Sequence, residues 1–191
     1  MNTNIIYGHV ERLSELLRLD SRTAGLEYGL QPVQLEVLRY LSVSNRFSDT
    51  PMAVTEYLGQ TKGTVSQTLK VLEKKELLVK KNDEKDRRST HLVLTEQGQK
   101  LLEEIIPSEV FLNACKDLTG SERKDITAAL ARLILSLLKA NNMKTFGVCK
   151  TCRYNTRTNT GDYYCNLVKT ALSDYEVELI CREHQAPEGE V

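Results

Sequence analysis

The stretch TPMAVTEYLGQTKGTVSQTLKVLEKKELLVKKNDEKDRRSTHLVLT, residues 50–95, decides the fold of this chain. Thr50, which a proline follows, predicts a capped helix that extends to about Leu58, because a threonine oxygen accepts the first unpaired backbone amides and proline fits the first turn. After a glycine-containing break, a second helix is predicted from Lys62 to Lys75. Two short helices joined by such a tight turn indicate a helix-turn-helix.

The same stretch ends in a pattern typical of a β-hairpin. Residues 77–81 are short and strand-like, and residues 82–89 (NDEKDRRS) are polar and charged, as a loop would be. Residues 90–95 (THLVLT) alternate and are β-branched, which predicts the return strand. A hairpin directly after a helix-turn-helix is a wing. The predicted fold class is therefore mainly α with a small β-wing.

Two further helices are predicted upstream of this stretch. One covers residues 4–19, a connection with two glycines follows over residues 20–30, and the other helix begins at Pro32. Each has apolar residues at helical spacing, which marks one face for burial. These residues are Ile6, Val10, Leu13 and Leu17 in the first helix, and Leu35, Leu38 and Leu41 in the second.

The segment after the hairpin predicts helices with a wide apolar surface. One helix is expected from about Glu96 to Lys116 with a bend near Pro107, and another opens at the capping box Thr119–Glu122 and extends to about Asn141. The second helix is apolar over so wide an arc that more than one partner must cover it. We interpret it, with the first helix of the chain, as a homodimer interface; burial within its own subunit is the alternative.

We divide the chain into five parts. Residues 1–30 hold a dimerisation helix and its connection, 31–98 the winged helix-turn-helix, 99–144 the C-terminal dimerisation helices, 145–186 a cysteine-rich metal-binding segment termed the cysteine module, and 187–191 a tail. The cysteine module has few long apolar runs, so it cannot bury much core by itself and needs another source of stability.

Composition bounds the class of protein. Of the 191 residues, 40% are hydrophobic and 27% charged, which is ordinary for a soluble globular protein and argues against a disordered chain. The longest apolar stretch, residues 130–138, is far shorter than the roughly 20 residues that span a bilayer, so no membrane location is expected. The N-terminus has no basic start and no apolar run of an export signal, and we therefore expect a cytoplasmic protein.

Basic residues are concentrated in the helix-turn-helix and wing. The whole chain carries 26 basic and 26 acidic residues, whereas residues 60–91 hold nine basic and five acidic ones, which suits phosphate binding. On the second helix of the stretch, Val65, Leu69 and Leu72 form an inward stripe. Hydroxyl, amide and ammonium groups on the outward face suit the base edges and phosphates of double-stranded DNA. The outward residues with these groups are Lys62, Thr64, Ser66, Gln67 and Lys70. A polar helical face alone is usually only solvated, and it is the adjacent wing that favours DNA binding.

Residues 86–98, DRRSTHLVLTEQG, resemble the wing signature of the MarR family of winged-helix regulators. That signature has Asp and Arg two positions apart, Leu-x-Leu-Thr on the return strand and a glycine three positions later. Residues 64–66 and 72–75 resemble the recognition helix of the family, and residues 30–41 resemble its second helix. The resemblance covers about residues 4–143.

The resemblance implies a homodimer that places one recognition helix per subunit in a major groove and each wing near a minor groove. It implies a repressor that binds a pseudo-palindromic operator and whose DNA affinity is lowered by a small-molecule effector or by cysteine oxidation. Within the wing it implies that Asp86 pairs with Arg88, and that Arg87 or Arg88 supplies the minor-groove contact. Lys85 is a further candidate DNA contact.

Two positions depart from the family pattern. Glu76 stands where the family often has glycine, and Lys80 with Lys81 stand where an arginine is common. Both departures bear on the local turn geometry and leave the predicted fold unchanged.

The cysteine module carries the pattern Cys149-x2-Cys152-x12-Cys165-x15-Cys181-x2-His184. Two close pairs of soft donors separated by a loop are how one chain wraps a tetrahedral ion. Five candidate ligands are present for four positions, and we favour four thiolates, with His184 beside them or as an alternative ligand. A structural zinc ion is the favoured cofactor, an iron–sulfur cluster is the alternative, and a thiol–disulfide switch without metal is the third possibility.

Other functions fit the sequence less well. A thiol oxidoreductase or metal hydrolase would need a βαβ setting around the first cysteine pair or a nucleophile constellation, and the sequence has neither, so no enzyme is expected. Docking of a partner protein on the cysteine module is a third hypothesis. Cys115, beside Phe111 and Leu112, is expected to be a small buried residue, with a sensor role as the alternative. We therefore predict a sequence-specific DNA-binding transcriptional regulator with a cysteine metal centre that is structural or sensory.

Overall fold

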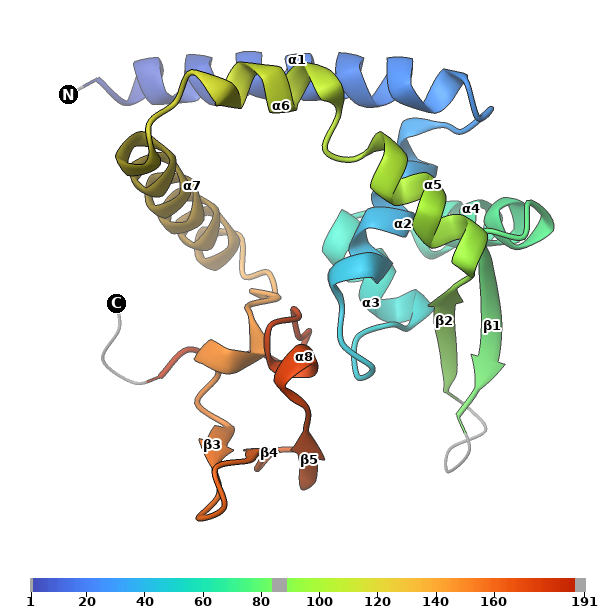
Figure 1. Cartoon of the computed structure of the whole chain (residues 1–191), viewed down its shortest axis with the longest axis vertical. Helices are drawn as coiled ribbons and strands as arrows, with labels where there is room; N and C mark the ends of the chain where they lie inside the picture. The colour runs from blue at the N-terminus through green and yellow to red at the C-terminus, as the bar shows by residue number, and fades with distance from the viewer. Residues whose placement is uncertain (1, 84–88, 188–191) are drawn as a thin grey trace.

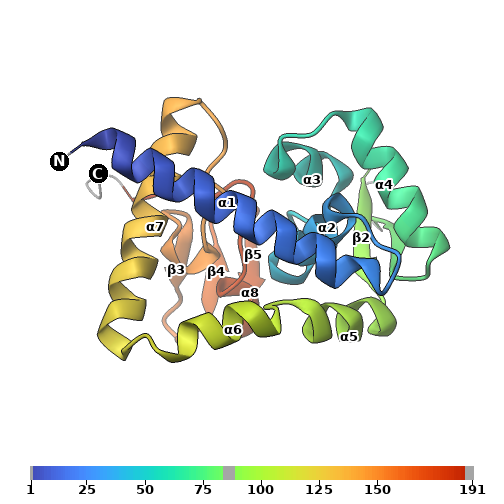
Figure 2. The ribbon, with the colours of Figure 1, turned by 90° about the horizontal axis from the view of Figure 1, so that it is seen from above.

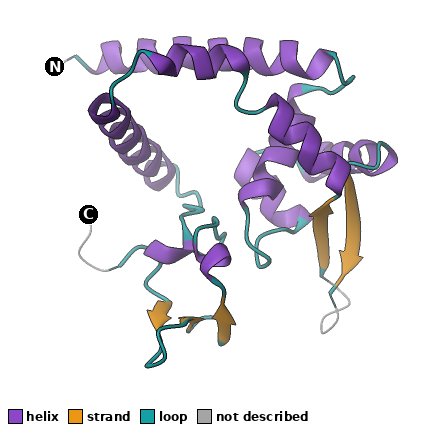
Figure 3. Cartoon of the chain, viewed as in Figure 1, coloured by secondary structure: helices purple, strands orange, loops and turns teal. Residues whose placement is uncertain are grey.

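The structure, a computed structural model, describes residues 2–83 and 89–187 (Figures 1 and 3). Helices dominate it, with one β-hairpin beside them and a second small sheet near the C-terminus. The predicted fold class, mainly α with a small β-wing, is confirmed. In the described part of the chain, no helix combines the length and the apolar character that crossing a membrane would need.

The winged helix consists of α2 (Pro32–Val43), α3 (Pro51–Leu58), α4 (Lys62–Lys74) and the hairpin β1 (Leu78–Asn82) and β2 (Thr90–Leu94). The predicted Thr50 cap is present, because its hydroxyl oxygen accepts an amide hydrogen of the first turn of α3. Thr61 caps α4 in the same way. The two strands pair antiparallel along their whole length. Figure 1 shows the hairpin extending away from α4, as a wing does.

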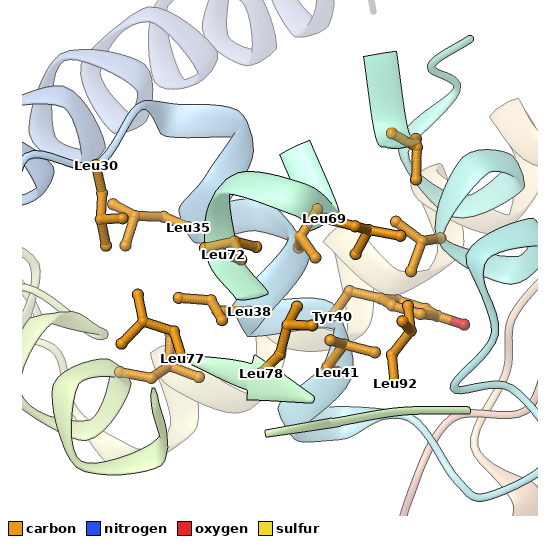
Figure 4. Packing of buried hydrophobic residues seen from close by; sticks show 14 of the residues in the cluster. Leu30, Leu35, Leu38, Tyr40, Leu41, Leu69, Leu72, Leu77, Leu78 and Leu92 are labelled. Carbon is orange, nitrogen blue, oxygen red and sulfur yellow. The ribbon is translucent and has the colours of Figure 1, made fainter. Parts of the chain in front are cut away.

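The main hydrophobic core lies inside the winged helix, where leucines of α2, α4 and β1 converge (Figure 4). Tyr40 is also buried there, and its hydroxyl donates to the carbonyl oxygen of Ser48 at 2.6 Å. All the inner-face residues predicted for α2 and α4 are at most 8% exposed: Leu35, Leu38, Leu41, Val65, Leu69 and Leu72. The helical spacing of these residues therefore predicted the core correctly.

The first helix, α1 (Thr3–Leu26), is longer than predicted. Residues 20–26 continue the helix instead of forming a connection, because the glycine at position 25 serves close packing there. A Cβ atom on Gly25 would lie 2.7 Å from the carbonyl oxygen of Leu30. The turn itself is at Gly29, where φ is 59° and glycine is favoured.

The helix predicted over residues 96–116 is in fact two helices, α5 (Glu96–Ile105) and α6 (Glu109–Lys116). Pro107 has no amide hydrogen to continue the helical ladder. Ser108 then starts a new helix, since its Oγ accepts an amide hydrogen of the first turn at 3.1 Å. The prediction of one bent helix was wrong because this second cap makes the break complete.

The helices α1, α6 and α7 (Gly120–Ala140) form an arm outside the main core (Figures 1 and 2). The predicted capping box of α7 is present, with both hydrogen bonds between Thr119 and Glu122. Within the single chain neither α6 nor α7 has a buried residue, and the only one in α1 is Gly25. The alternative that α7 is buried in its own subunit is therefore not what this structure has.

The cysteine module contains the 3₁₀ helix η1 (Cys149–Thr151), an antiparallel sheet in the order β3-β4-β5 and the short helix α8 (Asp174–Val177). The strands are β3 (Asn155–Arg157), β4 (Tyr163–Cys165) and β5 (Thr170–Leu172). Its own core is small, as expected, and consists of Cys149, Tyr163, Leu172 and Val177. The module also contacts the winged helix, since Phe146 enters the main core beside Tyr40 and Tyr57.

Candidate nucleic-acid interface and cysteine cluster

The recognition helix α4 is held by the hydrophobic core on its inner face and by hydrogen bonds at both ends. Its inward stripe fills the core, and Thr61 Oγ1 caps its start by accepting the amide hydrogen of Thr64 at 3.2 Å. At its end, the amide of Leu77 donates to the carbonyl of Leu72 at 3.0 Å, and the amide of Glu76 donates to that of Glu73 at 3.0 Å. This pair of bonds is the Schellman arrangement that stops a helix. A helix held in this way presents its outer face rigidly.

The outer face of α4 holds all five of the residues predicted there, namely Lys62, Thr64, Ser66, Gln67 and Lys70, and all are exposed. Figure 1 shows that α4 lies next to the hairpin of the wing. Thr64 is partly engaged in the cap, because its hydroxyl lies 2.9 Å from that of Thr61. The predicted wing residues Lys85, Asp86, Arg87 and Arg88 lie outside the described residues.

One of the basic residues counted in this region is paired with an acidic residue. Lys80 on β1 lies 2.6 Å from the carboxylate of Glu73 on α4, and the pair joins the wing to the recognition helix. An ion pair of this exposure contributes little stability. Its effect is to reduce the positive charge that faces a phosphate, so Lys62 and Lys70 are the stronger candidates on the described surface.

A groove of about 560 Å³ lies between α3, α4 and the wing. Lys62 and Ser66 of α4 line it on one side and Thr90 of the wing on another. Arg182 of the cysteine module also lines this groove, although it is more than a hundred residues away in the chain. Sequence reasoning missed Arg182, because nothing in its local pattern reports that the module packs beside the recognition helix.

The base of the wing is anchored by His91. Its Nδ1 lies 2.6 Å from Asp49, in the segment between α2 and α3, and its Nε2 lies 3.1 Å from Asp83 on the wing. The hydrogen bond with Asp49 is the main reason why the pKa of His91 is raised, while burial is the main reason why the pKa of Asp49 is raised. His91 thus has a structural role, because it joins the α2–α3 segment to the wing.

Cys149 and Cys181 lie diagonally on either side of a short β-bridge, opposite Leu179 and Gly147 respectively. Val148 pairs antiparallel with Ile180, the amide of Cys149 donates to the carbonyl of Leu179, and the amide of Cys181 donates to that of Gly147, both at 2.9 Å. Because side chains alternate along a strand, the two cysteines that follow the bridged pair lie on the same face. The first member of each predicted close pair is therefore brought together by main-chain bonding.

The other two cysteines lie beside this pair. Cys152 ends the turn η1, and its amide donates to the carbonyl of Cys149 at 3.1 Å. Cys165 is opposite Asn155 in the small sheet, and the Asn155 amide group donates to Cys149 Sγ at 3.6 Å. Burial raises the pKa of Cys149 to about 11, with further contributions from the nearby thiols of Cys181, Cys165 and Cys152. Cys165 and Cys181 thus pack against the buried cluster that contains Cys149, and Cys152 follows Cys149 by one turn.

His184 is placed differently from the cysteines. Its Nε2 lies 2.9 Å from the hydroxyl of Thr151 and its Nδ1 lies 3.3 Å from that of Thr145, so both ring nitrogens have partners. The ring lies against Gly147, where a Cβ would be 2.4 Å from Nδ1. Among the described residues, 2–83 and 89–187, no group of three or more histidine, cysteine, aspartate or glutamate side chains is placed to hold a metal ion. The four cysteines, all of them described, therefore do not form a ligand cluster in this structure.

Cys115 differs from its expected environment. It is partly exposed, and its neighbours Phe111 and Leu112 are exposed as well. The prediction of a buried residue was wrong for the single chain, because α6 has no core of its own to pack against.

Comparison with known proteins agrees with this geometry. Residues 28–89 match a sequence model of the MarR family. The fold resembles a MarR transcriptional regulator from Methanosarcina mazei Go1, with a TM-score of 0.61 and 24% identity over 72% of this chain and 99% of that chain. No curated protein matches the chain.

Two structures of MepR from S. aureus are also similar. The protein in its DNA-binding conformation has a TM-score of 0.59 and 26% identity, covering 69% of this chain and 98% of that chain. The MepR–DNA complex has a TM-score of 0.55 and 26% identity, covering 68% and 97%. These proteins are covered almost completely, so more than a quarter of this chain has no counterpart in them. Residues 28–89 are therefore similar to the MarR family, and the chain has the winged-helix fold that these similar structures share.

Proposed function

We propose that the chain is a cytoplasmic transcriptional repressor that binds a pseudo-palindromic operator as a homodimer. The observation that carries the proposal is the rigid outer face of α4, where Ser66, Gln67 and Lys70 stand exposed beside the wing. Such groups hydrogen bond to base edges and phosphates, and a helix of this kind fits a major groove. The likeness to MepR in a complex with DNA supports the same mode of binding.

Binding to DNA is tested with duplexes selected by the protein from a random library. The variant Gln67→Ala is expected to bind the selected duplex roughly tenfold more weakly and to lose preference at one base pair, because a glutamine that pairs with a base contributes about 1–3 kcal/mol. Gln99→Ala is the matched control, since Gln99 is an exposed glutamine on α5. Parent-like binding and selectivity in Gln67→Ala would show that this contact is misassigned, and failure to select any duplex would remove the function itself.

The homodimer is supported by the bare apolar surface of the arm. Leu130 and Ile134 of α7 face Leu13 and Leu17 of α1 across a groove of about 480 Å³. Contiguous exposed apolar surface of this kind marks an interaction site. A second copy of the same helices suits it, since a two-fold dimer brings identical surfaces together. A small-molecule effector that lowers operator affinity belongs to the same proposal and rests on the family resemblance.

We further propose that the cysteine module binds one metal centre, with zinc ahead of an iron–sulfur cluster. Support comes from the spacing of the four cysteines in the sequence, from the packing of Cys165 and Cys181 against the cluster that contains Cys149, and from the small core of the module. Both metals take four cysteine thiolates, and a metal-bound sulfur often accepts a hydrogen bond such as that from Asn155. A colourless protein with one zinc per chain supports zinc, a brown one with iron and acid-labile sulfide supports the cluster, and metal-free active protein rejects both.

A further inference from the structure

Besides Phe146 and the 2.9 Å ion pair between Arg46 and Glu176, one residue of the second cysteine turn attaches the cysteine module to the winged helix. The amide of Ile180 donates to the carbonyl of Val43 at 2.8 Å, and the amide of Asn45 donates to the carbonyl of Ile180 at 3.0 Å. Ile180 is thereby bridged to Ser44, between α2 and α3, and on its other side to Val148 beside the first cysteine turn. Ile180 therefore links the α2–α3 segment of the winged helix to the first cysteine turn.

The residue after Cys181 makes the second attachment. The Arg182 guanidinium holds the Glu56 carboxylate of α3 through two bonds, Nε to Oε2 at 2.6 Å and Nη2 to Oε1 at 2.7 Å. The Arg182 amide donates to the hydroxyl of the buried Ser48 at 2.8 Å. A paired, bidentate contact of this kind fixes orientation as well as position. Because Arg182 also lines the groove beside α4, the attachment reaches the predicted DNA surface.

The charges of this attachment bear directly on DNA binding. Glu56 lies on the helix that precedes the recognition helix, and Arg182 neutralises it; the bonds from Arg182 lower the pKa of Glu56. Without Arg182 at this place, the groove would lose its guanidinium group, and the carboxylates of Glu56 and Glu183 would lose this partner. Both changes oppose the approach of phosphate.

Apart from Phe146 in the main core and the ion pair of Glu176 with Arg46 of the winged helix, the module has little apolar burial to hold this segment in place. Its buried cluster contains four residues, and one of them is Cys149 itself. Small segments with so little apolar burial are commonly stabilised by a metal ion, whose binding energy becomes folding energy. Holding Cys149 and Cys181 on one ion would fix the Val148–Ile180 bridge between them, and with it the position of Arg182.

On the basis of the metal centre and DNA function proposed above, we infer that Cys149, Cys152, Cys165 and Cys181 bind one metal centre. This centre holds Ile180 and Arg182 against the α2–α3 segment of the winged helix. We call this metal-dependent attachment the latch. His184 is not a ligand; it braces the two cysteine turns through Thr151, Thr145 and Gly147. The metal-bound chain has the higher operator affinity, and loss of the metal frees the segment and weakens binding.

The test compares the full chain loaded with Zn²⁺ and the same chain after chelation under reducing conditions. Binding to the selected duplex is expected to fall roughly tenfold on chelation, within the usual range for coupled sites, and to recover with one equivalent of Zn²⁺. Hydrogen exchange at the amides of Asn45, Ile180 and Arg182 should accelerate in parallel, and this second measurement does not depend on DNA.

Variants separate the latch from the metal. Arg182→Gln is expected to retain zinc and to lose a similar share of affinity, whereas Arg157→Gln, an arginine of the same module that contacts Tyr163 instead of the winged helix, should keep both. His184→Gln should retain one zinc per chain. If zinc binds but chelation changes neither affinity nor exchange, the latch is wrong while the metal centre stands. If no metal binds, both are wrong. If the chain binds zinc but no DNA, the proposed function fails and the exchange data alone decide the latch.

Discussion

Glu76 occupies a position that usually belongs to glycine. It follows the recognition helix with φ of 59°, in the left-handed region where a Cβ atom is strained. The backbone here forms the Schellman arrangement all the same, and the Thr95 hydroxyl donates to the Glu76 carbonyl at 2.6 Å. The departure from the family pattern noted in the sequence therefore leaves the turn geometry unchanged. Its effect is the backbone strain of this one residue.

Replacing this residue by glycine should stabilise the protein. We expect Glu76→Gly to raise the free energy of unfolding by about 1 kcal/mol, because relief of left-handed strain exceeds the extra chain entropy that glycine loses. Denaturant unfolding measures the change. Lys75→Gly, at a neighbouring residue with φ of −83°, should lower stability instead. Equal loss in both variants would mean that the Glu76 side chain makes a contribution larger than the strain.

At the scale of single residues, what the sequence predicts depends on how local the cause is. The burial of Leu69 and the exposure of Gln67 follow from helical spacing, and the structure has both. The partners of Arg182 and His91 do not follow, because Glu56 and Asp49 lie far away in the chain. Whether four cysteines converge also depends on tertiary folding, although their spacing alone drew attention to them.

Among the elements, α5 shows why a glycine belongs to the wing signature. Gly98 is buried in its first turn, and a Cβ atom there would lie 2.1 Å from the carbonyl oxygen of Leu77 and 3.2 Å from its Cα. These are backbone atoms at the start of β1, so no rotamer change can relieve the contact. The amide of Thr95 also donates to that carbonyl at 3.1 Å. The wing and α5 can approach this closely only through glycine.

We therefore expect Gly98→Ala to destabilise the chain by about 2 kcal/mol, in spite of the better helix propensity of alanine. The neighbouring substitution Gln97→Ala is the control, since Gln97 is exposed and should change stability by less than about 0.5 kcal/mol. Thermal or denaturant unfolding of both variants checks this. A Gly98→Ala protein as stable as its parent would show that α5 and the wing can separate without cost.

The beginnings of elements were predicted better than their ends. Caps such as Thr50, Thr61 and Thr119 act within three residues, so the sequence states them directly. The end of α1 depends instead on how Gly25 packs against Leu30 and against the side chain of Leu35 on α2. The end of an element is thus often a tertiary event, and propensity alone does not locate it.

For the whole molecule, the sequence indicated the parts but not how they join. The winged helix, the helical arm and the cysteine module each have a local pattern that the structure reproduces. The contact of the module with the α2–α3 segment joins residues that are more than a hundred positions apart. In the single chain this contact joins the module to the winged helix, whereas the apolar surface of the arm is exposed.

The bare arm yields the last prediction, which concerns assembly. Ile134 is 56% exposed on α7, so Ile134→Glu should leave the folded subunit intact. In a two-fold dimer it would bury two carboxylates against apolar partners, and we expect the dimer dissociation constant to rise by roughly a hundredfold or more. Analytical ultracentrifugation measures this, with circular dichroism to check the fold. Val168→Glu in the cysteine module, where Val168 is 42% exposed, is the control and should remain dimeric.

Operator binding should weaken in Ile134→Glu together with the loss of the dimer, because two half-sites bound by separate subunits lose the benefit of linkage. A parent chain that is monomeric at binding concentrations, or a dimeric Ile134→Glu, would require another partner for this surface.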